Sequence, residues 1–86
     1  MKEIWVKLNS LDDVQRFASA AGDHPLHIAA TSDHVTIDAK SLMALFSLDL
    51  RAPVKISIDG GEDAAEKFCK SVRNLMVNRF GQAVYA

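Results

Sequence analysis

Four short segments alternate apolar and polar residues with a period of two, and this alternation constrains the fold more than any other feature. The segments are residues 3–8, 24–31, 34–38 and 54–58. The first is the strictest, with Ile4, Val6 and Leu8 on one face. A strand with one apolar and one mixed face buries only one side, so these segments predict a sheet covered by helices on one face only.

The second and third segments are expected to pair as a hairpin. Only Ser32 and Asp33 separate them, and so short a link favours antiparallel neighbours. In this interpretation Val35 and Ile37 face the core.

A helix is expected directly after the first strand. Ser10 is a suitable N-cap, because its hydroxyl can accept a hydrogen bond from the backbone N–H of Asp13. Apolar residues then recur at helical spacing, and Gly22 is expected to end the helix. The recurring residues are Leu11, Val14, Phe17, Ala18 and Ala21.

The most regular helical pattern lies near the C-terminus. Its apolar stripe consists of Ala65, Phe68, Cys69, Val72, Leu75 and Met76. The stripe predicts a helix that ends at Gly81 and places Cys69 in the core. Residues 81–86 are then expected to form a loosely ordered tail, in which Val84 and Tyr85 are available to dock on the domain or on a second copy.

A short and unusually apolar helix is expected within residues 39–50, between two strands. Leu42, Met43 and Phe46 share one face of this helix, while Leu45 lies on another. Either two surfaces cover the helix, or one apolar patch is left open for a partner.

Length and charge exclude several classes of function. The 86 residues suffice for one domain, residues 1–86, and a net charge of −1 provides no electrostatic basis for binding nucleic acid or an anionic membrane. No apolar run approaches the roughly 20 residues of a membrane helix. A single cysteine cannot form an internal disulfide, which is compatible with a reducing compartment, and a cytoplasmic protein is the default expectation.

The order of the segments is strand, helix, strand, strand, helix, strand, helix, which predicts an α+β open-faced sandwich. Residues 39–50, with a lysine–serine pair, an apolar helix, a serine–leucine step and a loop, resemble HPr, the histidine-containing phosphocarrier of the bacterial sugar phosphotransferase system. The resemblance continues through residues 54–58 and 61–65. It implies a four-stranded antiparallel sheet with three helices on one face.

The resemblance fails where the family carries its chemistry. HPr transfers a phosphoryl group from enzyme I to sugar-specific permease components on a histidine at the start of its first helix. This chain has Asp12 and Asp13 at that junction and lacks the partner arginine and the proline. An imidazole is a competent nucleophile near neutral pH, whereas two carboxylates at a helix N-terminus repel a phosphate. We therefore predict a degenerate phosphoacceptor site.

The short helix is the other feature that the resemblance makes functional. In the family the equivalent patch docks enzyme I, permease components and regulators. Here Leu42, Met43 and Phe46 would form its apolar centre, and Lys40 and Arg51 its rim.

Ser41 has two compatible interpretations. As an N-cap it stabilises the short helix. It also matches a serine that a dedicated HPr kinase phosphorylates in Gram-positive relatives, and a phosphoryl dianion is favourable at a helix N-terminus. Ser41 is therefore a candidate regulatory phosphorylation site.

His24, His27 and His34 are the only imidazoles, and we interpret them as surface residues rather than a relocated phosphoacceptor or a metal pair. No catalytic, cofactor-binding or metal-binding set is recognised. The sequence thus predicts a non-catalytic HPr-like protein that docks on enzyme I, permease components, HPr kinase or a transcription regulator. The alternatives are an unorthodox phosphocarrier and an unrelated module that dimerises through the open sheet face; the sequence does not decide the oligomeric state.

Overall fold

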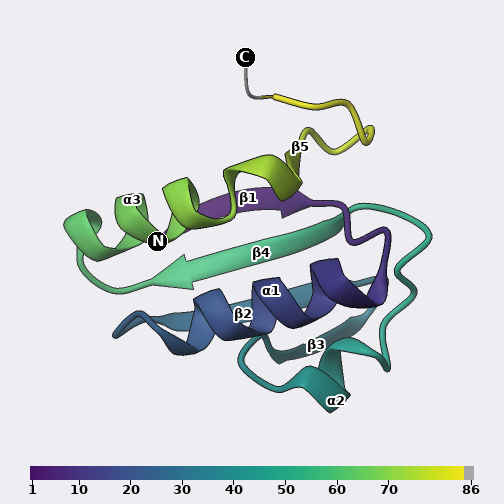
Figure 1. The fold of residues 1–86 in the computed structure, drawn as a ribbon, viewed down its shortest axis with the longest axis horizontal. Helices are drawn as coiled ribbons and strands as arrows, with labels where there is room; N and C mark the ends of the chain where they lie inside the picture. Colours follow the sequence, from purple (N-terminus) through teal and green to yellow (C-terminus); the bar gives the residue numbers. More distant parts are fainter. Residues whose placement is uncertain (85–86) are drawn as a thin grey trace.

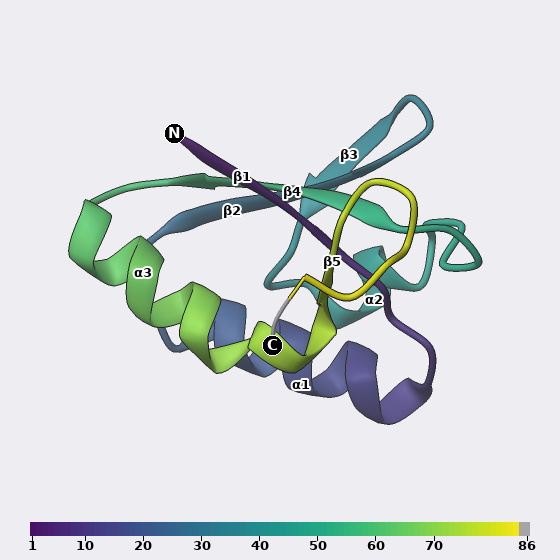
Figure 2. The same ribbon diagram turned by 90° about the horizontal axis from the view of Figure 1, so that it is seen from above.

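The computed structural model describes residues 1–84 and forms a five-stranded antiparallel sheet with the helices on one side (Figures 1 and 2). The elements are β1 (Lys2–Val6), α1 (Leu11–Gly22), β2 (His27–Ser32), β3 (Val35–Asp38), α2 (Leu42–Leu45), β4 (Val54–Asp59), α3 (Glu62–Ser71), the 3-10 helix η1 (Arg73–Leu75) and β5 (Met76–Val77). The strand order is β3-β2-β4-β1-β5. The predicted open-faced α+β sandwich is confirmed.

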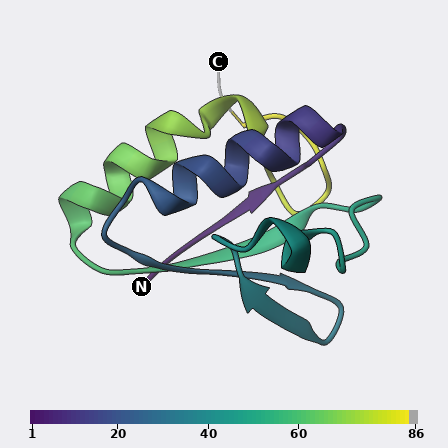
Figure 3. The ribbon, with the colours of Figure 1, turned by 60° about the horizontal axis from the view of Figure 1, so that its bottom comes forward.

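The core forms where the apolar face of the sheet meets α1 and α3. Ile56 lies opposite Ile4 on one side and Ala30 on the other, so inward residues of three strands form a continuous row. Phe17 of α1 and Phe68 of α3 are fully buried over it, with ring centroids 5.7 Å apart in an edge-to-face arrangement. Figure 3 shows the two helices side by side over the sheet. This packing supplies most of the buried apolar surface and therefore most of the driving force for folding.

The β2–β3 hairpin forms as predicted, with Ser32 opposite Val35. The prediction that Val35 faces the core is wrong, because its side chain is 49% exposed. Val35 begins the edge strand, and Figure 2 shows this end of the hairpin projecting away from the helices. Ile37, two residues later, does pack against the core.

The sheet has five strands rather than the predicted four, because the last helix ends ten residues earlier than expected. Ser71, the final residue of α3, donates its hydroxyl to the carbonyl of Phe68 at 2.6 Å, a back-bond that competes with continued helix. The backbone N–H of Lys7 then donates to the carbonyl of Leu75 at 2.9 Å. Met76 thus pairs with the free edge of β1 as the first residue of β5. Leu75 and Met76 still pack against the core, which explains why the apolar pattern of α3 continues through them.

Residues 78–83 fold back on β5. Asn78 donates its backbone N–H to the carbonyl of Gln82 at 2.8 Å, and Val77 forms a bridge with Ala83. The expected tail at residues 81–86 lies partly outside the described residues, and the expectation for Tyr85 falls outside them altogether.

Cys69, which was expected in the core, is half-buried and packs against the core residues. This burial raises the pKa of its thiol. Over residues 1–84, no helix has both the length and the apolar character required to cross a bilayer.

Candidate functional site

The short helix α2 presents two different faces. Leu45 is fully buried and anchors the helix in the core, and Leu48 is nearly so. Met43 is 84% exposed and Phe46 is 48% exposed, and Leu42 lies beside them at the surface. Of the two arrangements that the sequence allowed, the structure thus has the open apolar patch.

The first turn of α1 extends this patch. Leu11, the first of the apolar residues that recur at helical spacing in α1, is 59% exposed. It lines a shallow groove with Phe46 and Leu50, between the start of α1 and the end of α2, and Lys7 and Arg51 stand at the groove's margin. Leu11 is the first residue of its helix, a full turn before the first buried residue, and therefore lies outside the part of α1 that the sheet covers.

We call the exposed apolar residues Leu11, Leu42, Met43 and Phe46 the docking surface. Sequence reasoning found three of them and missed Leu11, whose helical spacing resembles that of a core residue. The signal that distinguishes Leu11 is its position directly after the N-cap, where a helix often extends beyond its packing partner.

Ser41 has the predicted N-cap geometry. Its Oγ accepts a hydrogen bond from the N–H of Ala44 at 3.3 Å, and its own N–H donates to the carbonyl of Asp38 at 3.0 Å. The side chain is exposed to solvent. Lys40 beside it donates from Nζ to the carbonyl of Leu26 at 3.2 Å, which ties this end of α2 to the main body of the fold.

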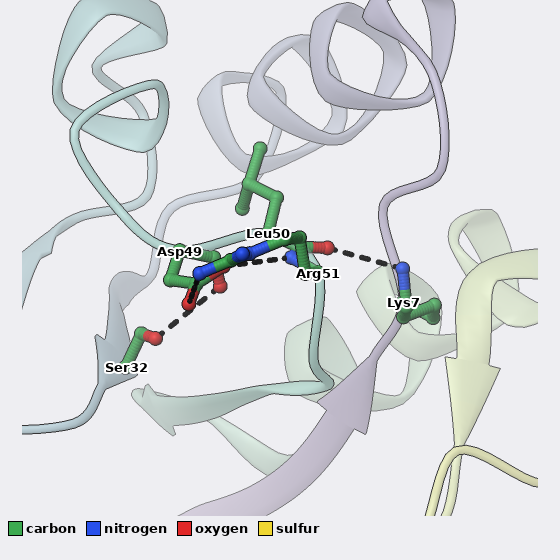
Figure 4. Close-up of polar contacts among 5 residues, drawn as sticks. All are labelled: Lys7, Ser32, Asp49, Leu50 and Arg51. Atoms are coloured by element: carbon green, nitrogen blue, oxygen red, sulfur yellow. Dashed lines mark hydrogen bonds and ion pairs between the residues drawn. The ribbon is translucent and has the colours of Figure 1, made fainter.

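The loop after α2 is held by a set of polar contacts (Figure 4). Arg51 donates from Nε and Nη2 to the two carboxylate oxygens of Asp49, each at 3.0 Å. These hydrogen bonds, with a further one from the backbone of Arg51, lower the pKa of Asp49 to about 2. Lys7 Nζ donates to the carbonyl of Leu50 at 3.0 Å, and Ser32 Oγ to that of Asp49 at 3.4 Å. The loop that carries Arg51 is therefore fixed to the ends of β1 and β2.

The start of α1 holds carboxylates where the resemblance would place a phosphoacceptor. Ser10 Oγ accepts from the N–H of Asp13 at 3.1 Å, and Asp13 Oδ2 accepts from the N–H of Asn9 at 3.0 Å. Asp12 forms an ion pair with Arg16 at 2.9 Å on the next turn. Two of the backbone donors of this junction are thus satisfied from within the chain.

The imidazoles occur elsewhere in the fold. His24 follows the C-terminal end of α1, and its Nδ1 lies 2.8 Å from the carbonyl oxygen of Ala20. The length of α1, about 18 Å, therefore separates His24 from the start of that helix. His27 begins β2, and His34 lies in the β2–β3 turn; both are exposed. Among residues 1–84, no group of three or more histidine, cysteine or acidic side chains is arranged to hold a metal ion.

The fold is that of the HPr phosphocarriers. HPr from Thermoanaerobacter tengcongensis is similar over 98% of this chain and 100% of its own, with a TM-score of 0.69 and 25% identity. The histidine-containing phosphocarrier protein of a mycoplasma is similar over 85% of this chain and 89% of its own, with a TM-score of 0.68 and 14% identity. No family model matches the sequence, and no curated protein matches it.

Proposed function

We propose that this chain is a non-catalytic HPr-like protein that acts by docking on protein partners of the sugar phosphotransferase system, in the bacterial cytoplasm. The observation that carries the proposal is an exposed apolar docking surface on an HPr fold whose first helix starts with carboxylates. Exposed apolar residues clustered in one patch of the surface are typical of an interaction site. The fully buried Leu45 holds that face in place.

Loss of phosphoryl transfer follows from the chemistry of the α1 start. A phosphocarrier needs a nucleophile there that is neutral near pH 7 and leaves phosphorus readily. Asp12 and Asp13 instead add negative charge where a phosphate would approach; Asp12 pairs with Arg16, and Asp13 accepts the backbone N–H of Asn9. His24 lies at the opposite end of the same helix.

Incubation with enzyme I and phosphoenolpyruvate tests this part of the proposal. We expect no acid-labile phosphohistidine on the chain, while HPr from Thermoanaerobacter tengcongensis serves as the positive control. A stable phosphohistidine would instead establish the unorthodox phosphocarrier. Replacing His24, His27 and His34 one at a time by alanine would then identify the acceptor.

Capture of purified enzyme I and permease components tests the docking role. Met43→Glu places a charge in the centre of the docking surface, so we expect at least about tenfold weaker binding, a loss of about 1.4 kcal/mol. Phe46→Glu should act in the same direction. Val35→Glu is the matched control, because Val35 is equally apolar and 49% exposed but lies on the hairpin. Equal binding by all three variants and the wild type would contradict the proposal.

We further propose that phosphorylation of Ser41 regulates this docking. A phosphoryl group carries about −1.5 to −2 charges at pH 7 and would lie beside Leu42, so it should weaken an apolar contact. The pair Ser41→Asp and Ser41→Asn separates charge from capping, since both residues cap a helix equally well. We expect Ser41→Asp to bind partners more weakly than Ser41→Asn; identical affinities, together with unchanged affinity after kinase treatment, would exclude the switch.

A further inference from the structure

The ionic groups around the docking surface are paired inside the chain. Residues 7–16 and 38–51, which carry this surface, contain four cations and four carboxylates. Three close pairs form among them: Arg16 with Asp12 at 2.9 Å, Lys40 with Asp38 at 3.8 Å, and Arg51 with Asp49 at 3.0 Å. The surface is therefore apolar at its centre and without net charge at its margin.

The remaining two charges are also engaged. Lys7 donates from Nζ to Asn9 Oδ1 at 2.8 Å and to the carbonyl of Leu50 at 3.0 Å. Asp13 accepts the N–H of Asn9. A charged partner would have to compete with these contacts, and at long range it would meet a field close to zero.

The hydrogen-bonding needs of its backbone limit the secondary structure of a partner segment that binds here. A segment lying on an apolar surface must satisfy its own N–H and C=O groups, which a helix does internally and an extended strand does only on a sheet edge. The two edges of this sheet are partly occupied by the chain itself. At one, β5 pairs with Trp5 and Val6 of β1; at the other, the Asp38 carbonyl accepts from Ser41.

The extent of the surface argues against a second copy of this chain as the occupant. Four partly exposed side chains present on the order of 400 Å², within the range of the largest apolar patch on an ordinary monomer. Two such patches together remain below the roughly 1,200 Å² of a stable interface. A small apolar contact is instead typical of a transient complex with another protein.

We infer that the docking surface binds an amphipathic helix of a partner protein through an apolar face with uncharged flanks, in a contact that salt does not weaken. This inference rests on the docking role proposed above. It differs from the cationic rim that the sequence predicted for Lys40 and Arg51, because the carboxylates of Asp38 and Asp49 neutralise both residues.

The test uses three synthetic helical peptides of about four turns that share one leucine-rich face and differ only in their flanks, which are glutamine, glutamate or lysine. Each is titrated into the isotope-labelled 86-residue chain while the backbone amide resonances are recorded. We expect the glutamine peptide to shift the amides of residues 11 and 42–46. We expect its affinity to change less than about threefold as salt shortens the Debye length from about 30 Å to about 3 Å.

The possible failures are distinguishable. A glutamate or lysine peptide that binds these residues at least tenfold more tightly at low salt, and loses that advantage at high salt, would overturn the inference and leave the docking role intact. If no peptide shifts these residues, or if Met43→Glu and Val35→Glu bind the glutamine peptide equally well, the inference fails; the docking role fails with it only if Met43→Glu also captures enzyme I and permease components as well as the wild type does. Retention of the wild-type amide spectrum by Met43→Glu, expected from the exposure of Met43, shows that the variant is folded.

Discussion

Helices α1 and α2 begin with the same kind of serine cap but differ in length and in the charge of their first turn. Ser10 and Ser41 each accept a hydrogen bond from the N–H three residues later, at 3.1 Å and 3.3 Å. At α1, that third residue is an acid that bonds back to the preceding loop, and the helix continues for 12 residues across the core. At α2, the first turn holds no acidic residue, the helix has four residues, and its outward side is apolar.

A shared cap therefore does not define a shared role. At α1 the first turn carries two carboxylates, and the helix lies across the core. At α2 Leu45 is the buried residue, and Leu42, Met43 and Phe46 are exposed.

The largest expected effect concerns Leu45, the buried residue of α2. Leu45→Ala removes a fully buried side chain and should lower the free energy of unfolding by about 2–5 kcal/mol, measured by urea denaturation. Met43→Ala, on the outward face of the same helix, should change it by no more than about 0.5 kcal/mol. Similar losses for the two variants would mean that α2 has no division between an anchored and a free face.

Removing the caps compares the two helix starts directly. Ser10→Ala should cost about 1 kcal/mol, because α1 spans the core and its N-terminal donors lose a partner. Ser41→Ala should cost less, since α2 is a single turn held chiefly by Leu45. A greater loss for Ser41→Ala in thermal unfolding would reverse the assignment of structural and functional helix.

The acid at the start of α1 contributes through its charge. Asp13→Asn keeps an oxygen that can accept from Asn9 and removes only the favourable interaction with the helix dipole, so we expect a loss of about 0.3–1 kcal/mol. Added salt should reduce this difference between variant and wild type. A variant that is more stable than the wild type would show that Asp13 is retained at a cost to the fold.

The smallest expected effect is the pH dependence of the loop after α2. The pKa of Asp49 in the folded chain is about 2, below its ordinary value of 3.8, so its pairing with Arg51 contributes stability above about pH 4 and loses it as the pH falls toward 2. An NMR titration of the Asp49 carboxyl should give a midpoint near 2. In Arg51→Gln the midpoint should return toward 3.8; an unchanged midpoint would mean that another group holds the carboxylate.

Local chemistry made much of this molecule predictable. The alternation in β1 and β4, the serine caps and the division of α2 into Leu45 and an apolar outer side all follow from periods and hydrogen-bonding capacity within a few residues. The carboxylates at the α1 start were equally visible, because residues 9–16 contain two aspartates and no histidine.

The tertiary structure alone decided which apolar side chains are covered. Leu11 and Val35 have the spacing of core residues and lie at the surface, because the helix and the hairpin extend past the neighbours that would bury them. Met76 continues the apolar stripe of α3 but belongs to a fifth strand, β5. Its backbone pairs with the edge of β1, and a longer helix would have left that edge without a partner. A period records which side of an element is apolar, whereas burial also requires that another element reach that side.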